Sequence, residues 1–89
     1  MKKMEDTENK YFIRFQAEDR FGVMGSIASV FGNNCVSLSQ VIQKQSTGKV
    51  AEIVVITESV QEKHLRDALA VFGGMSIVKE ISSVIRVYE

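Results

Sequence analysis

The chain has 89 residues, of which 45% are hydrophobic and 25% charged, and these proportions fit one globular domain. Eleven Lys and Arg balance eleven Asp and Glu, and the resulting net charge of zero argues against nucleic acid or a membrane surface as a partner. One cysteine and one histidine are too few for an internal disulfide or a zinc site. No apolar run approaches the roughly 20 residues that span a bilayer, so we expect a cytoplasmic protein.

The N-terminal part of the chain predicts a tail, a strand and a helix. Residues 1–9 are polar and of mixed charge, and we expect a flexible tail or linker there. Apolar and polar residues alternate over 10–18, which is typical of a half-buried strand. Apolar residues then follow helical spacing over 23–31, and the sequence GNN at 32–34 supplies residues that tolerate the left-handed conformation at a helix end.

The middle of the chain predicts two antiparallel strands. Residues 36–45 are rich in β-branched side chains, and a slip in their alternation predicts a bulge near Gln40. The polar residues 46–49 have the character of a hairpin loop. The following run, 50–57, is apolar on both faces, so we expect that strand inside the sheet.

A second helix and a last strand complete the pattern. Ser59 and Glu62 fit a capping box, although a helix start one or two residues later fits the pattern equally. The apolar spacing that follows predicts a helix to about Phe72, with Glu62 and Arg66 paired on its solvent side. A final strand is expected over 77–88, with a kink near Ser82. The order β-α-β-β-α-β predicts an α+β, ferredoxin-like fold with a four-stranded antiparallel sheet and two helices on one face.

Several apolar residues should lie on the sheet face away from the helices. An exposed apolar patch of this kind usually marks an interface. The alternative is that long neighbours, namely Arg14, Lys44 and Arg86, cover the patch with their aliphatic stems. The expected patch consists of Phe12, Val50, Val54 and Ile56.

The first strand-to-helix turn could bind a zwitterion such as an amino acid. The backbone amides near Gly22, Val23 and Met24 would carry the positive end of the helix dipole and attract a carboxylate. Asp19 could accept hydrogen bonds from an ammonium group. The alternative is that Asp19 only caps the helix and Gly22 only makes the turn.

The segment DRFGVMGSIASVFGNNCVSLSQVIQ, residues 19–43, resembles the first half of an ACT domain, a family of small-molecule sensors. The segments AEIVVIT, 51–57, and VKEISSVIRV, 78–87, are similar to the C-terminal ACT regulatory domain of bacterial homoserine dehydrogenases, so the resemblance covers 10–89. It implies a small amino-acid effector, threonine, that controls threonine and methionine biosynthesis by feedback. It also implies a homo-oligomer, as a dimer, and a catalytic domain in the same chain that uses NAD(P).

The resemblance places the effector between protomers, with the first turn on one side and residues of the second strand on the other. Phe21 stands where the family usually has Pro, which removes a fixed φ, and Cys35 stands where Gly is usual. The implied effector-binding residues are Asp19, Phe21, Gly22, Val23, Met24, Gly25, Asn33, Asn34, Gln40 and Gln43.

The remaining residues give little support for catalysis, and we expect no catalytic, metal or cofactor site in these 89 residues. His64 should be solvated on the second helix, and Cys35 should be a small buried side chain. Three alternatives stay open: an ACT module that serves only oligomer assembly, an ACT domain of another amino-acid pathway protein, and a hydrolase of the acylphosphatase kind. That hydrolase would use Arg20 beside the turn, but no Asn stands on the second or third strand to orient its water.

Overall fold

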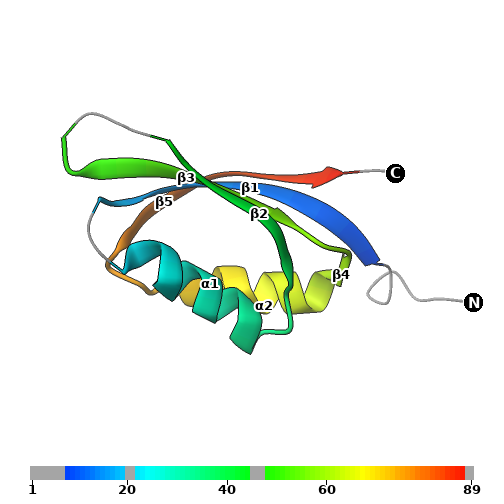
Figure 1. Ribbon diagram of the computed structural model, residues 1–89. Helices are drawn as coiled ribbons and strands as arrows, with labels where there is room; N and C mark the ends of the chain where they lie inside the picture. The colour runs from blue at the N-terminus through cyan, green and yellow to red at the C-terminus, as the bar shows by residue number, and fades with distance from the viewer. Residues whose placement is uncertain (1–7, 20–21, 45–47, 88–89) are drawn as a thin grey trace, which may run out of the picture.

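A computed structural model describes residues 8–19, 22–44 and 48–87, so Arg20, Phe21 and residues 1–7 of the predicted tail lie outside the described residues. Seven elements follow one another along the chain (Figure 1). They are β1 (Glu8–Glu18), α1 (Val23–Asn33), β2 (Leu38–Lys44), β3 (Val50–Thr57), β4 (Val60–Gln61), α2 (Glu62–Gly73) and β5 (Val78–Val87).

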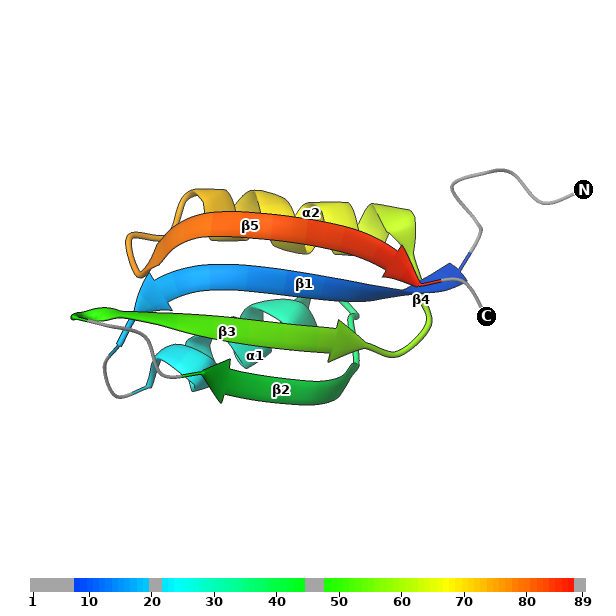
Figure 2. The same ribbon diagram turned by 90° about the horizontal axis from the view of Figure 1, so that it is seen from above.

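The four long strands form one antiparallel sheet in the order β2-β3-β1-β5, and both helices cover the same face of it (Figures 1 and 2). β1 lies in the middle of the sheet, paired with β3 on one side and β5 on the other. The structure thus confirms the predicted ferredoxin-like fold. β3 also lies inside the sheet, between β1 and β2, as its two apolar faces predict.

The two-residue strand β4 was not predicted from the sequence. Its residues Val60 and Gln61 pair with Asn9 and Glu8 of β1. Because these residues have backbone partners, β1 begins at Glu8 and takes in the last two residues of the predicted 1–9 tail.

The predicted capping box at the start of α2 is wrong. Ser59 precedes β4, and the N-cap position is occupied by Gln61, with extended dihedral angles of φ −69° and ψ 140°. None of the described side chains caps this helix by a hydrogen bond. The predicted surface pair is confirmed, with Arg66 Nη2 3.5 Å from Glu62 Oε2.

The end of α1 also differs from the prediction. Gly32 and Asn33 remain helical, and the residue with left-handed φ is Cys35, at +65°. The Cys35 N–H donates to Gly32 O, and the next N–H, that of Val36, donates to Phe31 O, so the reversal at Cys35 satisfies the last carbonyls of the helix. Cys35 is exposed, and the expectation that it is buried is therefore wrong.

Two strand irregularities expected from the sequence are present. The register of β2 against β3 shifts between Leu38 and Gln40, where a bulge was predicted. In β5, Ile81 pairs with Phe15 and Ser83 with Arg14, which leaves Ser82 as the extra residue of a bulge.

The core lies between the sheet and the two helices. Three fully buried rings, those of Phe15 in β1, Phe31 in α1 and Phe72 in α2, meet there with centroid separations of 4.9 to 6.2 Å. Thr57 is the one buried polar residue in the described part of the chain, and its Oγ1 accepts the Tyr11 N–H at 3.0 Å. This bond fixes β1 against the end of β3.

The sheet face away from the helices is partly apolar and partly covered. Ile42 is 43% exposed and Ile85 52%, whereas the predicted patch residue Val54 is only 3% exposed. Arg14 and Lys44 reach Glu52 across this face, at 3.7 and 3.9 Å. Arg86 does not contribute to the cover, because it pairs with Tyr11 and shares that residue's face toward the helices.

Candidate functional site

The first turn places a glycine at the start of α1. Gly22 is the N-cap with a left-handed φ of +84°, a conformation that strains other residues, and it is exposed. The first helical bond runs from Ser26 N to Gly22 O at 2.9 Å. The preceding amides, of Val23, Met24 and Gly25, therefore have no partner within the helix and form its positive end.

Asp19 is held beside this turn by two hydrogen bonds. Its N–H donates to Lys49 O at 2.7 Å, and its Oδ1 accepts from Gln43 Nε2 at 3.3 Å. Two residues predicted for one site, 24 positions apart in the sequence, are thus in contact within one protomer. Among the described residues no side chain caps α1, so Asp19 does not serve as its cap.

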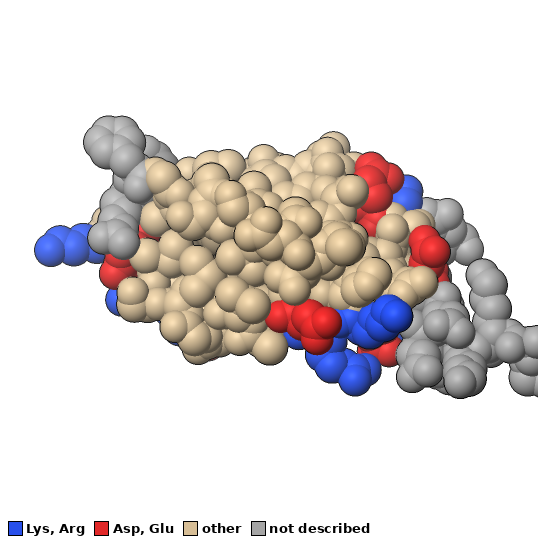
Figure 3. All heavy atoms as spheres, turned by 90° about the horizontal axis from the view of Figure 1, so that it is seen from below, with Lys and Arg blue, Asp and Glu red and all other residues tan. Residues whose placement is uncertain are grey.

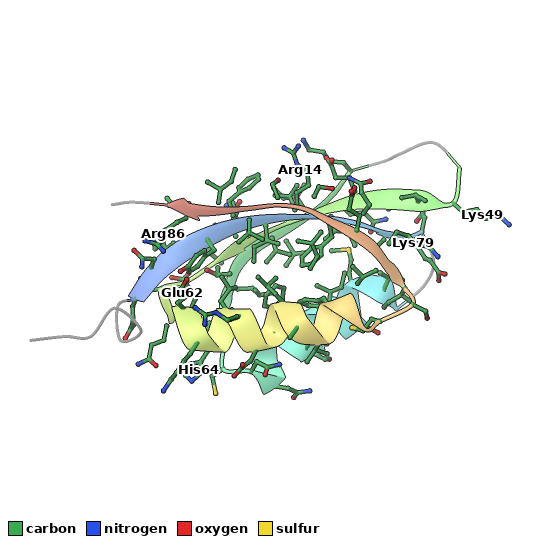
Figure 4. All side chains as sticks on the ribbon, turned by 180° about the vertical axis from the view of Figure 1, so that it is seen from behind. Arg14, Lys49, Glu62, His64, Lys79 and Arg86 are labelled. Carbon is green, nitrogen blue, oxygen red and sulfur yellow. The ribbon has the colours of Figure 1, made fainter. Side chains whose placement is uncertain are left out.

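A hollow of about 510 Å³ adjoins the turn, and most of its residues were not predicted from the sequence. Lys79 Nζ lies 3.3 Å from Glu18 Oε1, and Lys49 stands at the same end of the sheet (Figure 4). Both signs of charge therefore line one surface next to Asp19. The sequence gives only a weak indication of this hollow, because its residues come together only through the register of three strands. The lining residues are Glu18, Asp19, Lys49, Val50 and Lys79.

Three predicted residues lie away from the first turn in the same protomer. Asn33 and Asn34 are at the opposite end of α1, about 16 Å along an 11-residue helix. Asn34 Nδ2 donates to Val30 O at 2.8 Å and stabilises that end. Gln40 pairs with Ile56 and Gln43 with Ile53, so the two glutamine side chains leave β2 on opposite faces.

The two helices differ in charge, because α2 carries Glu62, Lys63, Arg66 and Asp67 whereas α1 carries none. In Figure 3 the charged side chains lie toward the margin of the surface over the helices, and its middle is uncharged. Beyond its first turn, α1 therefore offers no charged side chain to an ionic ligand.

Two further reactive side chains, His64 and Cys35, lie together away from the first turn. His64 is half-buried, contrary to the expected solvated side chain, and shares a shallow hollow of about 200 Å³ with Cys35. Within ranges 8–19, 22–44 and 48–87, no three His, Cys, Asp or Glu side chains are grouped so that they could hold a metal ion. None of the described helices is long and apolar enough to cross a membrane.

Comparison with known proteins gives consistent relatives. A homoserine dehydrogenase of Synechocystis is 43% identical over 84 residues, which are 94% of this chain and 19% of that protein. One of Neisseria gonorrhoeae is 34% identical over 84 residues, which are 93% of this chain and 19% of that protein. The chain thus spans about a fifth of the length of these relatives.

Solved structures agree with the fold. A homoserine dehydrogenase from Thiobacillus denitrificans superposes with a TM-score of 0.84 at 24% identity, over 97% of this chain and 19% of that one. The ACT domain of GTP pyrophosphokinase from Chlorobium tepidum gives a TM-score of 0.61 at 14% identity, over 92% of this chain and 89% of that one. The family model of the ACT domain matches residues 11–72, and the chain belongs to the ACT domain family.

Proposed function

We propose that the chain is the regulatory ACT domain of a homoserine dehydrogenase and that it binds a small amino acid, threonine, at the first turn. The similarity of nearly the whole chain to homoserine dehydrogenases supports the parent protein. The position of Asp19 supports the site, because its carboxylate is held by Gln43 next to the free amides of α1. The dehydrogenase chemistry, with NAD(P), would belong to a catalytic domain outside these 89 residues.

The turn offers a complementary partner to each charged group of a zwitterion. The effector carboxylate would accept hydrogen bonds from the amides of Val23, Met24 and Gly25, at the positive end of α1. The effector ammonium would donate to Asp19, whose second oxygen is not engaged by Gln43. Because Gly22 has no side chain and nothing stands within 4 Å of its Cβ position, the ligand can approach the backbone closely.

A second copy of the chain would complete the site. Asn33 and Asn34 lie at the far end of α1, and Gln40 leaves β2 on the face opposite to Gln43. A dimer could present these three residues to Asp19 from its other half. Binding between protomers would favour the arrangement that forms the site and disfavour others. Such a differential affinity is what feedback control of threonine and methionine biosynthesis requires.

The test is calorimetric titration of the purified chain with threonine, using serine, isoleucine, methionine and lysine as comparators. Threonine should bind saturably, and Asp19→Asn should weaken it about tenfold or more, because a charge-assisted hydrogen bond is lost. Asp67→Asn, the same change at an exposed position of α2, is the matched control and should bind as the wild type does. Unchanged affinity in Asp19→Asn, or no amino-acid binding at all, would refute the site.

A second candidate is a module that only assembles protomers. Exposed apolar residues on the open sheet face, namely Ile42, Ile85 and Val87, favour it. This function predicts a constant oligomeric state that does not respond to any amino acid. Sedimentation velocity with and without threonine distinguishes the two candidates.

A further inference from the structure

The open sheet face, which points away from the helices, carries its charges in one band and its apolar side chains beside that band. We propose that this face docks on the same face of a second copy of the chain, about a twofold axis parallel to the strands. The interface is separate from the first turn and needs no amino acid to form. The apolar side chains on the face are those of Phe12, Ile42, Val54, Ile56, Ile85 and Val87.

The register of the strands separates the two kinds of side chain. An apolar row crosses β3, β1 and β5 where Phe12 lies between Ile56 and Ile85. A polar row crosses the same strands four residues further along β1, at Gln16, whose Nε2 donates to Glu52 Oε1 at 3.3 Å. An apolar area with a polar margin is the usual anatomy of a protein interface.

The charged band leaves a cation at one edge of the sheet and an anion at the other. Glu52 is shared between Arg14 and Lys44, whose nitrogens lie 3.7 and 3.9 Å from its carboxylate oxygens. One carboxylate balances one cation, and the side chain of Lys44, on the outer strand β2, is 59% exposed. Glu80, on the other outer strand, β5, accepts from Ser82 Oγ at 3.3 Å and has no ion pair within ranges 8–19, 22–44 and 48–87.

A half-turn about an axis parallel to the strands brings these opposite charges together. It sets β2 of one copy over β5 of the other and β3 over β1, because the sheet order is β2-β3-β1-β5. Lys44 then faces Glu80 of the second copy, and Glu80 faces the second copy's Lys44. Phe12 faces the second copy's Ile56, since these two residues share a row. An axis across the strands would instead lay the charged band on the apolar row and cost the charges their hydration.

The size of the face fits a pair of copies. At about 3.3 Å per residue and about 4.8 Å between strands, the four strands along residues 10–18 of β1 cover roughly 26 by 19 Å. This footprint of roughly 500 Å² on each copy buries about 1,000 Å² in the pair, the area that a specific interface needs. Two sheets pack about 10 Å apart, and a lysine and a glutamate side chain together span that gap. A second copy is the partner that fits, because this one face supplies both the surplus cation and the surplus anion.

The test reverses the two charges and follows dimerisation of the 89-residue chain by sedimentation equilibrium, without any amino acid. The wild type should dimerise. Lys44→Glu and Glu80→Lys should each weaken the dimer by about tenfold or more, because like charges then face each other. The double variant Lys44→Glu/Glu80→Lys forms both pairs with reversed polarity and should dimerise as the wild type does. A wild type that stays monomeric, as it would if another domain covers this face, or a double variant as weak as its singles, would overturn the proposal.

Rescue in the double variant can come only from contact between copies. Lys44 and Glu80 of one copy are on the two outer strands, three strand spacings or about 14 Å apart, and cannot pair directly. The control Lys44→Glu/Asp67→Lys restores the net charge at an exposed position of α2 and should stay as weak as Lys44→Glu alone. If this control is rescued too, net charge and not the pair governs association, and the proposed geometry is wrong. Melting temperatures of all variants confirm that each one is folded.

The outcome is independent of the first-turn site. Asp19 lies beyond the end of β1 and outside the docking face, so Asp19→Asn should dimerise as the wild type does. Failure of threonine to bind would leave this interface standing. Failure of the charge reversal to rescue the dimer would leave the first-turn site standing.

Discussion

Cys35 is a residue in a conformation that its side chain disfavours. Its φ of +65° ends α1, and a side chain other than glycine in this region costs about 1–2 kcal/mol. It is exposed, so no packing of the thiol offsets this cost. The reversal is kept because the N–H groups of Cys35 and Val36 bind the last carbonyls of the helix.

We therefore predict that Cys35→Gly stabilises the domain. Relief of the left-handed strain exceeds the extra unfolded-state entropy of glycine, for a net gain of about 0.5–1 kcal/mol. In a domain of this size the melting temperature should rise by about 2–8 °C. Cys35→Ala keeps the strain and is the control. Equal melting temperatures for the Gly and Ala variants would contradict the prediction.

Some features of single residues could be predicted from the sequence and others could not. Asp19 and Gln43 were both predicted for the site, because the residue types and the family resemblance point to them, but their mutual hydrogen bond depends on how β2 lies beside the turn. Lys49 and Lys79 were missed, since no local pattern marks a lysine that becomes part of a hollow. The unpaired hydroxyl of Tyr11 was equally invisible, because a buried tyrosine on an alternating strand has the same pattern as any core residue.

At the scale of elements, the start of α2 is the least optimised helix end. Gln61 has the extended dihedral angles of an N-cap, but its side chain does not cap, and its Oε1 is buried without a partner among the described residues. β4 explains this arrangement, because Gln61 also pairs with Glu8 through the backbone. The residue serves a strand and a helix at once.

Gln61→Asp should stabilise the domain by about 1 kcal/mol. The shorter carboxylate can accept from the free amides of the first turn of α2 and removes the buried, unpaired amide oxygen. Urea denaturation measures the gain. Ser59→Ala is the informative control, since a true capping box would make it costly, whereas the structure predicts almost no change. A loss of stability in Gln61→Asp would show that its side chain supports β4.

The long elements were predictable and the short one was not. The buried alternation of β1 and the apolar stripes of α1 and α2 are strong periodic signals, and all three elements lie within one or two residues of their predicted bounds. A two-residue strand such as β4 has no period to detect. It exists only because β1 extends far enough to pair with it. For the same reason β1 begins at Glu8, two residues before its predicted start at residue 10.

At the scale of the whole molecule, the two faces of the sheet have different environments. One face packs on both helices and holds the three-phenylalanine core. The other leaves Ile42 and Ile85 about half exposed. An apolar surface of this kind on a small domain, which buries only about 60% of its chain surface, fits association with another protomer.

Ile85→Lys should weaken that association. A lysine placed in an apolar contact would have to lose its hydration, which disfavours the assembled state. Sedimentation velocity should show a shift toward the monomer, by about tenfold or more in dissociation constant. Val71→Lys, at an equally exposed apolar position on α2, is the control and should leave association unchanged. If both variants assemble as the wild type does, the open face is not the interface.

The pairing of β1 with β5 also determines how the domain would respond to a mechanical load. Lys10, near the start of β1, pairs with Val87 at the end of β5, and both described chain ends leave the sheet on the same side (Figure 1). A force that pulls these ends apart acts across the two strands, so it opens their hydrogen bonds one after another instead of shearing them together. The domain should therefore yield first around Tyr11, while the distant turn at Asp19 is still intact.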